Sequence, residues 1–477
     1  NLNKMSELMV TGKRKLGGKI RISGAKNAVL PQMAASLLTR EKIVLRNVPD
    51  ITDVNDMILT LEAYGVTVTW DKPNSTLELQ AGQPTSHLPV RNAGENIRAA
   101  FLVFGPLLAR TGRAEVYKPG GCKIGKRPVD FHIEAMEQMG ATLIKKDSNK
   151  VFMEAKYGLT NHISNHTGQI TLKRSVGATE TALMAASLVD GETVIRNAAI
   201  EPEIYDLAEM LEKMGARIVI EQDVLITEEI TRFGIKEEIE RWNVITVNGC
   251  KRLNGVDHQV MPDRIELGTY AIAAAMNNAA IVLEVKKDKK NEMLDSIFQP
   301  LKEAGVKTAE RKSRRGEYTE IEISLKDGII KPVDIKTGPY PEFPTDLLPQ
   351  WVAFMTQATP SSGKRYSTVH EQIFESRFNY VNGLIAMGAK IEKVNDREYR
   401  VYGGAELNGT RVDATDLRGG AALVLAGLVA KGTTVVRKFG NVQRGYEDMV
   451  GKLNKCGAKL EILKPPRPGH HGGPGPF

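Results

Sequence analysis

A single cysteine lies in a glycine-rich, strongly cationic segment that runs Pro119-Gly-Gly-Cys-Lys-Ile-Gly-Lys-Arg-Pro128. Nearby Lys and Arg side chains favour the thiolate, so Cys122 is expected to be more reactive than an ordinary thiol. A cysteine kept only for packing would more often lie among apolar residues in a helix or strand. The same cations, together with Lys118, form a candidate binding site for an anionic ligand. We therefore interpret Cys122 as a reactive side chain beside an anion site.

The same segment nearly matches a phosphate-binding P-loop, because residues 120–126 have the pattern G-x-x-x-x-G-K after a strand-like run at 113–117. The hydroxyl residue that should follow, as a magnesium ligand, is replaced by Arg127. Pro128 comes next, so a helix would begin late. A nucleotide-hydrolysing P-loop is therefore disfavoured, although backbone N–H groups beside glycine can still approach an anion.

The other two cysteines indicate no chemistry. Cys456 ends an amphipathic helical pattern, where it is expected to be a small apolar side chain, and Cys250 lies in a polar turn. Three scattered cysteines make neither a disulfide framework nor a paired zinc site. No cluster of His, Cys and carboxylate residues has metal-ligand spacing. We expect neither a metal nor a cofactor.

The composition is that of an ordinary soluble protein with more than one domain. The chain has 477 residues, of which 42% are hydrophobic and 26% charged. No apolar run reaches the ~18 residues of a membrane span, and no secretory signal begins the chain, so we expect a cytoplasmic protein with no membrane partner. The net charge of +8 suits an anionic substrate. The longest basic runs lack interleaved aromatic residues, so no nucleic-acid partner is expected.

Six segments repeat one pattern. Each contains a helix that ends in an apolar stretch followed by Gly and then Ala or Val, and each is followed by a strand-like segment. The glycine is expected at the C′ position that caps the helix. The six glycines are Gly65, Gly140, Gly215, Gly305, Gly388 and Gly457.

Upstream in every unit, an Ala-rich apolar helix begins near a charged residue. These residues are Lys26, Arg98, Lys173, Arg264, Asp346 and Arg418. Each unit is therefore expected to run strand, buried helix, strand, exposed helix, strand, and six units suggest two domains of three. Helix N-termini bind anions. If the six starts converge, they form a cleft for a strongly anionic ligand; the alternative is that the charges lie separately on the surface.

Short sequence motifs occur one after another along the chain, from about residue 10 to residue 463. They are Ser23-Gly-Ala-Lys26-Asn27, the cysteine segment through Asp130, Ser175-Val-Gly-Ala-Thr179, Glu201-Pro-Glu203, Pro262-Asp-Arg264-Ile-Glu266, Phe343-Pro-Thr-Asp346, Ile373-Phe-Glu-Ser-Arg377, Asp416-Leu-Arg418 and Arg444-Gly-Tyr446. Together they resemble the UDP-N-acetylglucosamine enolpyruvyl transferases, within the wider family of 5-enolpyruvylshikimate-3-phosphate (EPSP) synthase. The cysteine segment separates the resembled group from the EPSP synthases themselves, which have the same six-unit fold.

The resemblance implies a two-domain inverse α/β barrel, built from six βαβαββ-type repeats, with the active site in the cleft between the domains. The first domain would span 25–262 and carry the cysteine segment. The second would join 1–24 to 263–466. The Pro/Gly-rich tail at 467–477 is expected to be disordered. The oligomeric state stays open.

The implied reaction transfers the enolpyruvyl group of phosphoenolpyruvate to the 3′-hydroxyl of UDP-N-acetylglucosamine, with release of phosphate, and commits the sugar to peptidoglycan. Carbon 3 of phosphoenolpyruvate must gain a proton, and Cys122 is implied as the acid. The sugar hydroxyl must lose its proton as it attacks, and Asp346 is implied as the base. Without the resemblance, Asp346 would be interpreted as a helix N-cap. Lys26 and Arg444 complete the implied catalytic set.

The resemblance also implies how the substrates bind. Lys26, Arg127 and Arg444 match phosphate-binding positions, and Arg377 and Arg418 lie near the carboxylate of phosphoenolpyruvate, since bidentate Arg suits both groups. A further set matches positions that bind the nucleotide sugar. It comprises Asn27, Arg98, Arg127, Pro128, Val129, Asp130, Phe131, Lys173, Arg174, Ser175, Val176, Asp346 and Ile373.

Three positions and one short run depart from the pattern of the resembled group. Ile200 replaces an Arg, Gln443 an Asp and Glu342 a Gly, and the run at 347–350 is unusual after Asp346. None of these changes removes an implied catalytic group. Two alternatives stay open: a paralogue that uses a different nucleotide sugar, and a non-catalytic scaffold or RNA-binding relative.

Overall fold

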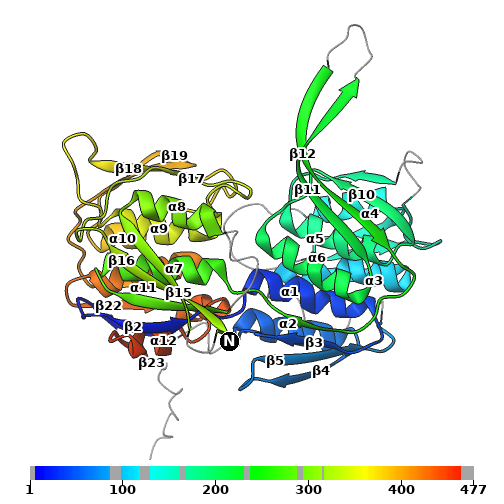
Figure 1. Ribbon diagram of the computed structural model, residues 1–477, viewed down its shortest axis with the longest axis horizontal. Helices are drawn as coiled ribbons and strands as arrows, with labels where there is room; N and C mark the ends of the chain where they lie inside the picture. Colours follow the sequence, from blue (N-terminus) through cyan, green and yellow to red (C-terminus); the bar gives the residue numbers. More distant parts are fainter. Residues whose placement is uncertain are drawn as a thin grey trace, which may run out of the picture.

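The computed structural model describes residues 6–85, 98–118, 129–161, 168–229, 237–286, 294–313 and 316–463, with backbone only at 98, 223–229 and 237–241. The described chain forms two halves, each around its own hydrophobic core (Figure 1). One core draws on buried residues from Ala25 to Met261. The other joins Leu8–Ile22 to residues from Ile265 to Leu460.

Three sheets belong to the first half, and their strands are largely antiparallel. They are β13 (Val256–Gln259), β3 (Ile43–Arg46), β5 (Thr76–Ala81) and β4 (Val66–Asp71); β6 (Arg113–Tyr117), β8 (Lys150–Glu154) and β7 (Thr142–Lys146); and β11 (Arg217–Glu229), β12 (Glu237–Gly249), β10 (Gly191–Arg196) and β9 (Gln169–Thr171).

Three sheets with the same pattern form the second half. They are β15 (Val306–Lys312), β16 (Tyr318–Leu325), β14 (Ile281–Lys286) and β2 (Gly18–Arg21); β17 (Ile335–Lys336), β18 (Tyr366–His370), β20 (Glu398–Tyr402) and β19 (Ile391–Asn395); and β21 (Arg411–Asp413), β22 (Thr433–Arg437), β1 (Glu7–Thr11) and β23 (Lys459–Leu463). In each of these three sheets, an edge strand pairs in parallel with its neighbour, and the remaining pairs are antiparallel.

Helices alternate between two types along the chain. Those of the first type are apolar on all sides and buried, which places them inside each half; they are α1 (Lys26–Ala35), α3 (Phe104–Thr111) with the preceding 3-10 turn η3 (Arg98–Val103), α5 (Val176–Ser187), α7 (Arg264–Met276), α9 (Leu348–Met355) and α11 (Leu417–Val429). Those of the second type bury one stripe; they are α2 (Thr52–Ala63), α4 (Asp130–Gln138), α6 (Pro202–Met214), α8 (Asp295–Glu303), α10 (Val381–Ala386) and α12 (Met449–Lys455).

The helix-ending glycines of the six repeats are all confirmed as C-terminal caps. Each has a positive φ, between 88° at Gly65 and 121° at Gly215. A side chain is strained in this left-handed conformation, and glycine is not. The pattern in the sequence therefore identified the end of the second helix in every unit.

The two halves are joined by two chain crossings that lie side by side. Strand β2 precedes α1 in sequence but pairs with β14 of the other half, and β13 precedes α7 but pairs with β3. At the crossings, the Ala25 amide donates to the Met261 carbonyl at 2.8 Å, and the Asp263 amide donates to the Ser23 carbonyl at 2.9 Å. The second half therefore takes β1 and β2 from the sequence that precedes α1, and the first half takes β13 from the sequence that precedes α7.

Strands β11 and β12 extend far beyond the body of the first half (Figure 1). They pair along their length, from Arg217 opposite Asn248 to Glu229 opposite Glu237. The pairing is antiparallel, with a shift of register between Glu221 and Val224. Separately, none of the helices within the described residues is long and apolar enough to cross a membrane.

Truncation inside one core should cost more stability than truncation at the surface. Leu425 of α11 is fully buried in the second core. We expect Leu425→Ala to lower the free energy of unfolding by about 2–5 kcal/mol, because it loses apolar burial and leaves a cavity. Ile462 on β23 is 39% exposed, so Ile462→Ala should cost about 0.5 kcal/mol or less. Urea unfolding followed by circular dichroism measures both; equal losses would contradict this account of the core.

Candidate active site

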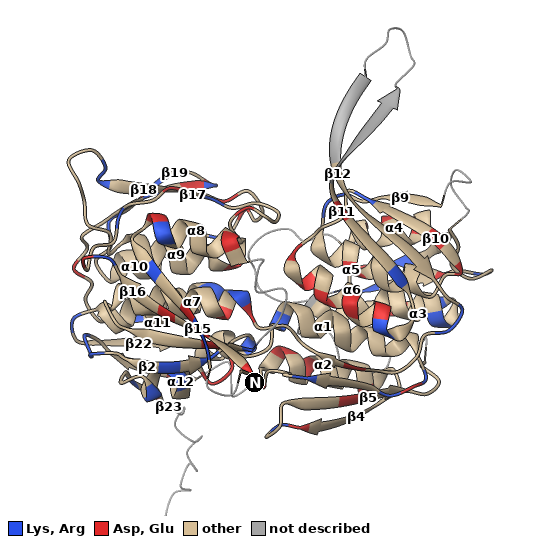
Figure 2. Cartoon of the chain, in the orientation of Figure 1, with Lys and Arg blue, Asp and Glu red and all other residues tan. Residues whose placement is uncertain are grey.

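A cavity of about 500 Å³ lies between the two halves and is lined from both. All six buried-helix units contribute residues at or next to the helix start. The predicted convergence of charged helix starts is confirmed for Lys26, Arg264, Asp346 and Arg418. It fails for Lys173, whose side chain is 63% exposed and pairs with Glu134 at 2.9 Å. The cationic starts of α1 and α7 lie at the helix ends that face the opposite half (Figure 2).

Charges of both signs line this cavity. Among the described residues, the cations are Lys26, Arg174, Arg264, Arg377, Arg418 and Arg444, and the acids are Asp53, Glu180, Glu201, Glu203, Glu342, Asp346 and Asp416. Ions removed from water are stable only when they are paired and hydrogen-bonded. The pairing pattern therefore shows which charges are already satisfied and which remain available to a ligand.

Lys26 and Arg444 meet at Asp53, which bridges the two halves. The Arg444 Nε donates to Asp53 Oδ1 at 2.8 Å, and Lys26 Nζ lies 3.3 Å from Oδ2. Asp53 is in the first turn of α2, and its side chain is 4% exposed, whereas the two cations are each 15% exposed. One carboxylate thus holds two predicted phosphate-binding cations together, and the pair keeps an excess positive charge toward the cavity.

A second pair of cations meets at Asp346. The Nη2 of Arg377 donates to Asp346 Oδ1 at 2.9 Å, and the Nη2 of Arg418 donates to Oδ2 at 3.1 Å. Asp346 lies in a 3-10 turn, η5 (Thr345–Leu347), and its side chain is 27% exposed. Both arginines are almost fully buried. The predicted base and the two predicted carboxylate-binding arginines therefore form one cluster.

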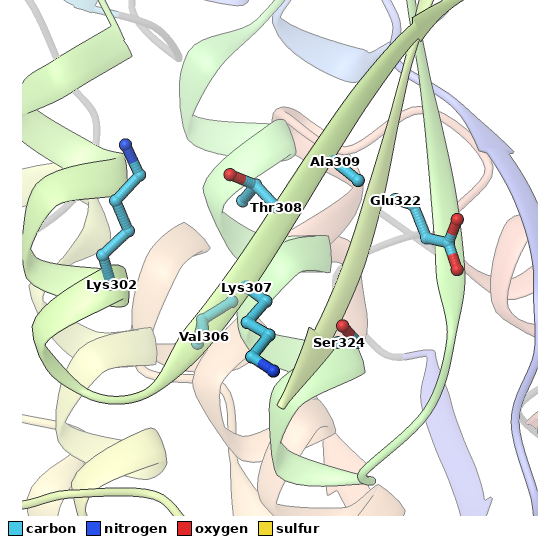
Figure 3. Close-up of a pocket in the computed structure, with 7 residues that line it drawn as sticks. All are labelled: Lys302, Val306, Lys307, Thr308, Ala309, Glu322 and Ser324. Atoms are coloured by element: carbon cyan, nitrogen blue, oxygen red, sulfur yellow. The ribbon is translucent and has the colours of Figure 1, made fainter. Parts of the chain in front are cut away.

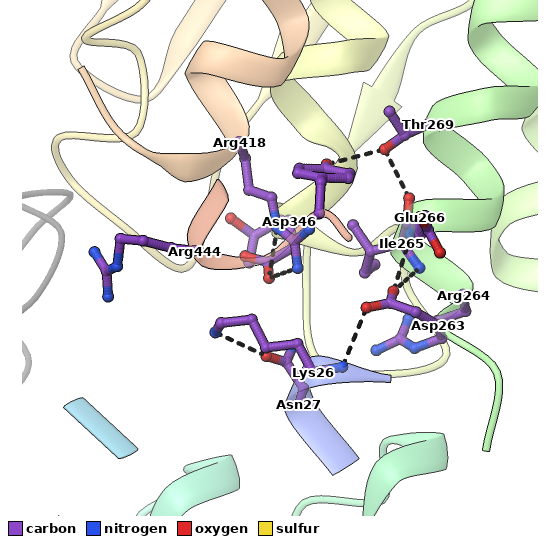
Figure 4. Close-up of polar contacts among 12 residues, drawn as sticks. Lys26, Asn27, Asp263, Arg264, Ile265, Glu266, Thr269, Asp346, Arg418 and Arg444 are labelled. Carbon is purple, nitrogen blue, oxygen red and sulfur yellow. Dashed lines mark hydrogen bonds and ion pairs between the residues drawn. The ribbon is translucent and has the colours of Figure 1, made fainter. Parts of the chain in front are cut away.

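The Arg418 guanidinium, which lies beside Asp346 in Figure 4, also contacts a buried polar network. Its carbon lies 5.2 Å from the centre of the Tyr446 ring, a cation–π distance. The Tyr446 hydroxyl accepts a hydrogen bond from Gln350 at 2.8 Å and lies 3.0 Å from the Thr269 hydroxyl. Burial alone would lower the pKa of Arg418, but the Tyr446 oxygen and the Asp346 carboxylate outweigh it and raise that pKa.

Three glutamates from the first half face one arginine from the second. Arg264, the first residue of α7, donates to Glu203 at 2.9 and 3.2 Å, and both side chains are buried. Burial raises the pKa of Glu180, and the nearby Glu203 and Glu201 carboxylates raise it further. Burial also raises the pKa of Glu201. One guanidinium accompanies three carboxyl groups here, and the raised pKa values of Glu180 and Glu201 favour the protonated form of these two side chains.

The predicted nucleotide-sugar residues whose side chains the structure describes divide into two groups. Those that line the cavity are Asn27, Val129, Phe131, Arg174, Ser175, Val176, Asp346 and Ile373. Asp130 and Lys173 do not: Asp130 pairs with Lys146 on the surface, and that ion pair lowers its pKa. Ser175 is the N-cap of α5, so its hydroxyl accepts from the Ala178 amide at 3.4 Å.

Several predicted residues lie outside the described residues. These are Cys122, Arg127, Pro128 and the tail at 467–477, together with the side chain of Arg98. Their assigned roles remain predictions. Of the other two cysteines, Cys456 is buried and Cys250 is partly buried. The expectation that Cys456 is a small apolar side chain at a helix end is confirmed, and burial raises the pKa of its thiol.

Sequence reasoning missed Asp53 and Glu180 as parts of this cavity. Asp53 lies in no recognised motif and is in the first turn of α2, where acids are common. Glu180 directly follows the motif that ends at Thr179. Glu180 interrupts an otherwise apolar run in α5, at 5% exposure. An acid inside a fully buried helix is a signal that could have identified Glu180.

A second hollow lies on the outer sheet of the second half (Figure 3). Strands β15 and β16 and the end of α8 provide its lining, which includes Lys302, Lys307 and Glu322. No predicted site residue lies there. Within the described residues, no group of three or more His, Cys, Asp or Glu side chains is placed to hold a metal ion.

Replacing Glu180 should change stability in a pH-dependent way. Because burial raises the pKa of Glu180 in the folded state, its contribution is present at low pH and is lost as pH rises through that raised pKa. We expect Glu180→Gln to be more stable than the parent at pH 8, by on the order of 1 kcal/mol, with a smaller difference at pH 5. Thermal unfolding at both pH values measures this.

The matched control is Glu137→Gln, on an exposed position of α4. It should change stability equally little at both pH values. A stability gain for Glu180→Gln that grows toward pH 5 would contradict the proposed protonation of the buried wall.

Comparison with known proteins places this cavity in context. The family model for EPSP synthase (3-phosphoshikimate 1-carboxyvinyltransferase) matches residues 10–228 and 220–453. A UDP-N-acetylglucosamine 1-carboxyvinyltransferase from Xanthobacter autotrophicus is 41% identical over 467 residues, covering 96% of this chain and all of that protein. UDP-N-acetylglucosamine 1-carboxyvinyltransferase 2 from Carboxydothermus hydrogenoformans is 40% identical over 464 residues, with 96% and 99% coverage.

Solved structures support the same fold. The enolpyruvyl transferase NikO from Streptomyces tendae superposes with a TM-score of 0.78 at 22% identity, over 97% of this chain and all of that one. EPSP synthase from Acinetobacter baumannii gives 0.67 at 17% identity, over 96% of this chain and all of that one. The predicted two-domain α/β fold is that of these proteins. With a family model that covers most of its length and relatives at about 40% identity, the chain belongs to the EPSP synthase family.

Proposed function

We propose that this protein transfers the enolpyruvyl group of phosphoenolpyruvate to the 3′-hydroxyl of UDP-N-acetylglucosamine, in the synthesis of peptidoglycan. The observation that carries the proposal is the pairing of cations in the cavity: Lys26 with Arg444 around Asp53, and Arg377 with Arg418 around Asp346. Phosphoenolpyruvate also has two anionic groups, a phosphate and a carboxylate. Relatives at about 40% identity over nearly their whole length carry the name of this activity.

The reaction follows an addition and an elimination. In the addition, carbon 3 gains a proton from Cys122, the sugar 3′-oxygen bonds to carbon 2, and the hydroxyl proton passes to Asp346. In the elimination, carbon 3 returns a proton to the Cys122 thiolate, the double bond between carbons 2 and 3 forms again, and the bond between carbon 2 and the phosphate oxygen breaks. The products are inorganic phosphate and the enolpyruvyl ether of the sugar nucleotide.

The cations have separate tasks in this proposal. Lys26 and Arg444, with Arg127, bind the phosphate and stabilise the charge that develops as it leaves. Arg377 and Arg418 hold the carboxylate in a bidentate manner. The nucleotide sugar lies toward Asn27, Phe131 and the start of α5, on the wall formed by the first half.

The two cores correspond to the two domains in this proposal, with 25–262 as one and 1–24 joined to 263–466 as the other. Ion pairs that cross between the halves, such as Arg264 with Glu203, support closure of the two domains around the ligands. Closure would exclude water and strengthen the electrostatic contacts.

Phosphate release from phosphoenolpyruvate tests the function directly. We expect the purified protein to release phosphate only when UDP-N-acetylglucosamine is present, and Cys122→Ser to lose most of this activity because serine is a much weaker acid. The same variant should resist alkylation by an epoxide phosphonate. Release by the parent protein with no sugar, or with a different nucleotide sugar only, would exclude the proposed acceptor; full turnover by Cys122→Ser would exclude the role of the thiol.

The role of Asp346 as base has its own test. We expect Asp346→Asn to keep the affinity for UDP-N-acetylglucosamine but to lower kcat by roughly 10²–10⁴-fold, the usual contribution of a general base. Glu342→Gln is the matched control, since it removes an acid from the same cavity lining. Steady-state kinetics measures both. Unchanged kcat in Asp346→Asn would remove the assignment.

A further inference from the structure

Two acidic side chains flank Arg377, and they differ in how firmly they are held. Asp416 is 3% exposed and lies 3.9 Å from Arg377, while its Oδ1 accepts the amides of Arg418 and Gly419 at 3.0 and 3.1 Å as the N-cap of α11. Asp346 is 27% exposed to the cavity and contacts both arginines directly. The Asp416 side chain is therefore fixed at the start of α11, whereas the Asp346 side chain can be displaced from the two arginines by a ligand carboxylate.

Both arginines keep other partners if Asp346 moves away. Arg377 also donates to the Thr345 carbonyl from Nε at 3.1 Å and from Nη2 at 2.8 Å. Arg418 remains stacked on Tyr446. The two guanidinium groups would thus stay in position, so an incoming anion would find them already oriented.

One donor in this cluster is unused. Among the described residues, Nη1 of Arg418 is buried and has no hydrogen-bond partner, although the residue is only 1% exposed and lines the cavity. An unsatisfied buried donor is costly and is commonly explained by a ligand that supplies the missing acceptor.

We infer that Asp346 occupies the place of the substrate carboxylate in the free protein, and that binding of that carboxylate to Arg377 and Arg418 releases Asp346 to act as the base. The inference rests on the proposed function. A carboxylate that accepts hydrogen bonds from two guanidinium groups is a weaker base than a free one. Asp346 therefore becomes able to accept the proton of the sugar hydroxyl only after phosphoenolpyruvate has bound.

Asp53, at the predicted phosphate site, differs from Asp346, and this difference limits the displacement to the carboxylate end of the ligand. Its carboxylate is 4% exposed and fixed in the first turn of α2, so it stays between Lys26 and Arg444 while a phosphate binds on their cavity side. Removing Asp346 should thus favour ligands with a carboxylate, and should matter little to a phosphate alone.

Calorimetric titration of the free protein, without nucleotide sugar, tests the exchange. We expect Asp346→Asn to bind phosphoenolpyruvate about five- to tenfold more tightly than the parent, because the internal competitor is gone. Its affinity for inorganic phosphate should change by less than about twofold. Asp346→Ala provides the same test if the Asn variant unfolds.

Glu342→Gln separates exchange from simple charge repulsion, since it removes an acid that lines the same cavity. It should leave the affinity for phosphoenolpyruvate within about twofold of the parent. Equal tightening by Glu342→Gln and Asp346→Asn, or no tightening by Asp346→Asn, would overturn the inference. Phosphate release by the parent protein is measured beside these titrations. If this release depends on the sugar while the titrations fail, the proposed function holds and only the inference about Asp346 is overturned.

Discussion

Buried positive charge is the constraint on which this structure depends. The cavity between the halves brings together six cationic side chains among the described residues, and the most buried of them, Arg264, Arg377 and Arg418, are 6% exposed or less. Such charges are stable away from water only beside counter-charges with good hydrogen-bond geometry. Asp53, Glu203 and Asp346 supply those counter-charges.

Because these carboxylates hold the cations in place, the cavity is already arranged to bind an anion. Asp53 serves two cations, so Lys26 and Arg444 keep one positive charge in excess. Arg377 and Arg418 are flanked by both Asp346 and Asp416, so a second anionic group can bind them when it takes the place of Asp346. The network of Gln350, Thr269 and Tyr446 under Arg418 orients one guanidinium in advance, which reduces the entropy lost on binding.

The exchange of strands between the halves determines how they are joined. Because β2 and β13 each pair with the half that the chain is leaving, the two crossings run side by side and hydrogen-bond to each other. Gly24 is needed there, since a Cβ on it would lie 1.8 Å from the Asn47 carbonyl oxygen. Next to the crossings, the Asp50 amide donates to Glu447 at 2.7 Å across the halves. The walls of the cavity therefore have a defined relative position.

The sequence by itself determined the repeat, the helix-capping glycines and the buried helices, because each depends on local conformation or on apolar periodicity. It also indicated, through the resemblance, the family and the cationic residues of the site. Only the tertiary structure decided which charges meet. Asp53 and Arg444 are 391 residues apart, yet their side chains are 2.8 Å apart. Asp130 and Lys173 belong to matching motifs but pair with Lys146 and Glu134 and are not part of the cavity lining. Residue type and spacing fix a helix start; the direction and partner of a side chain depend on how distant elements pack.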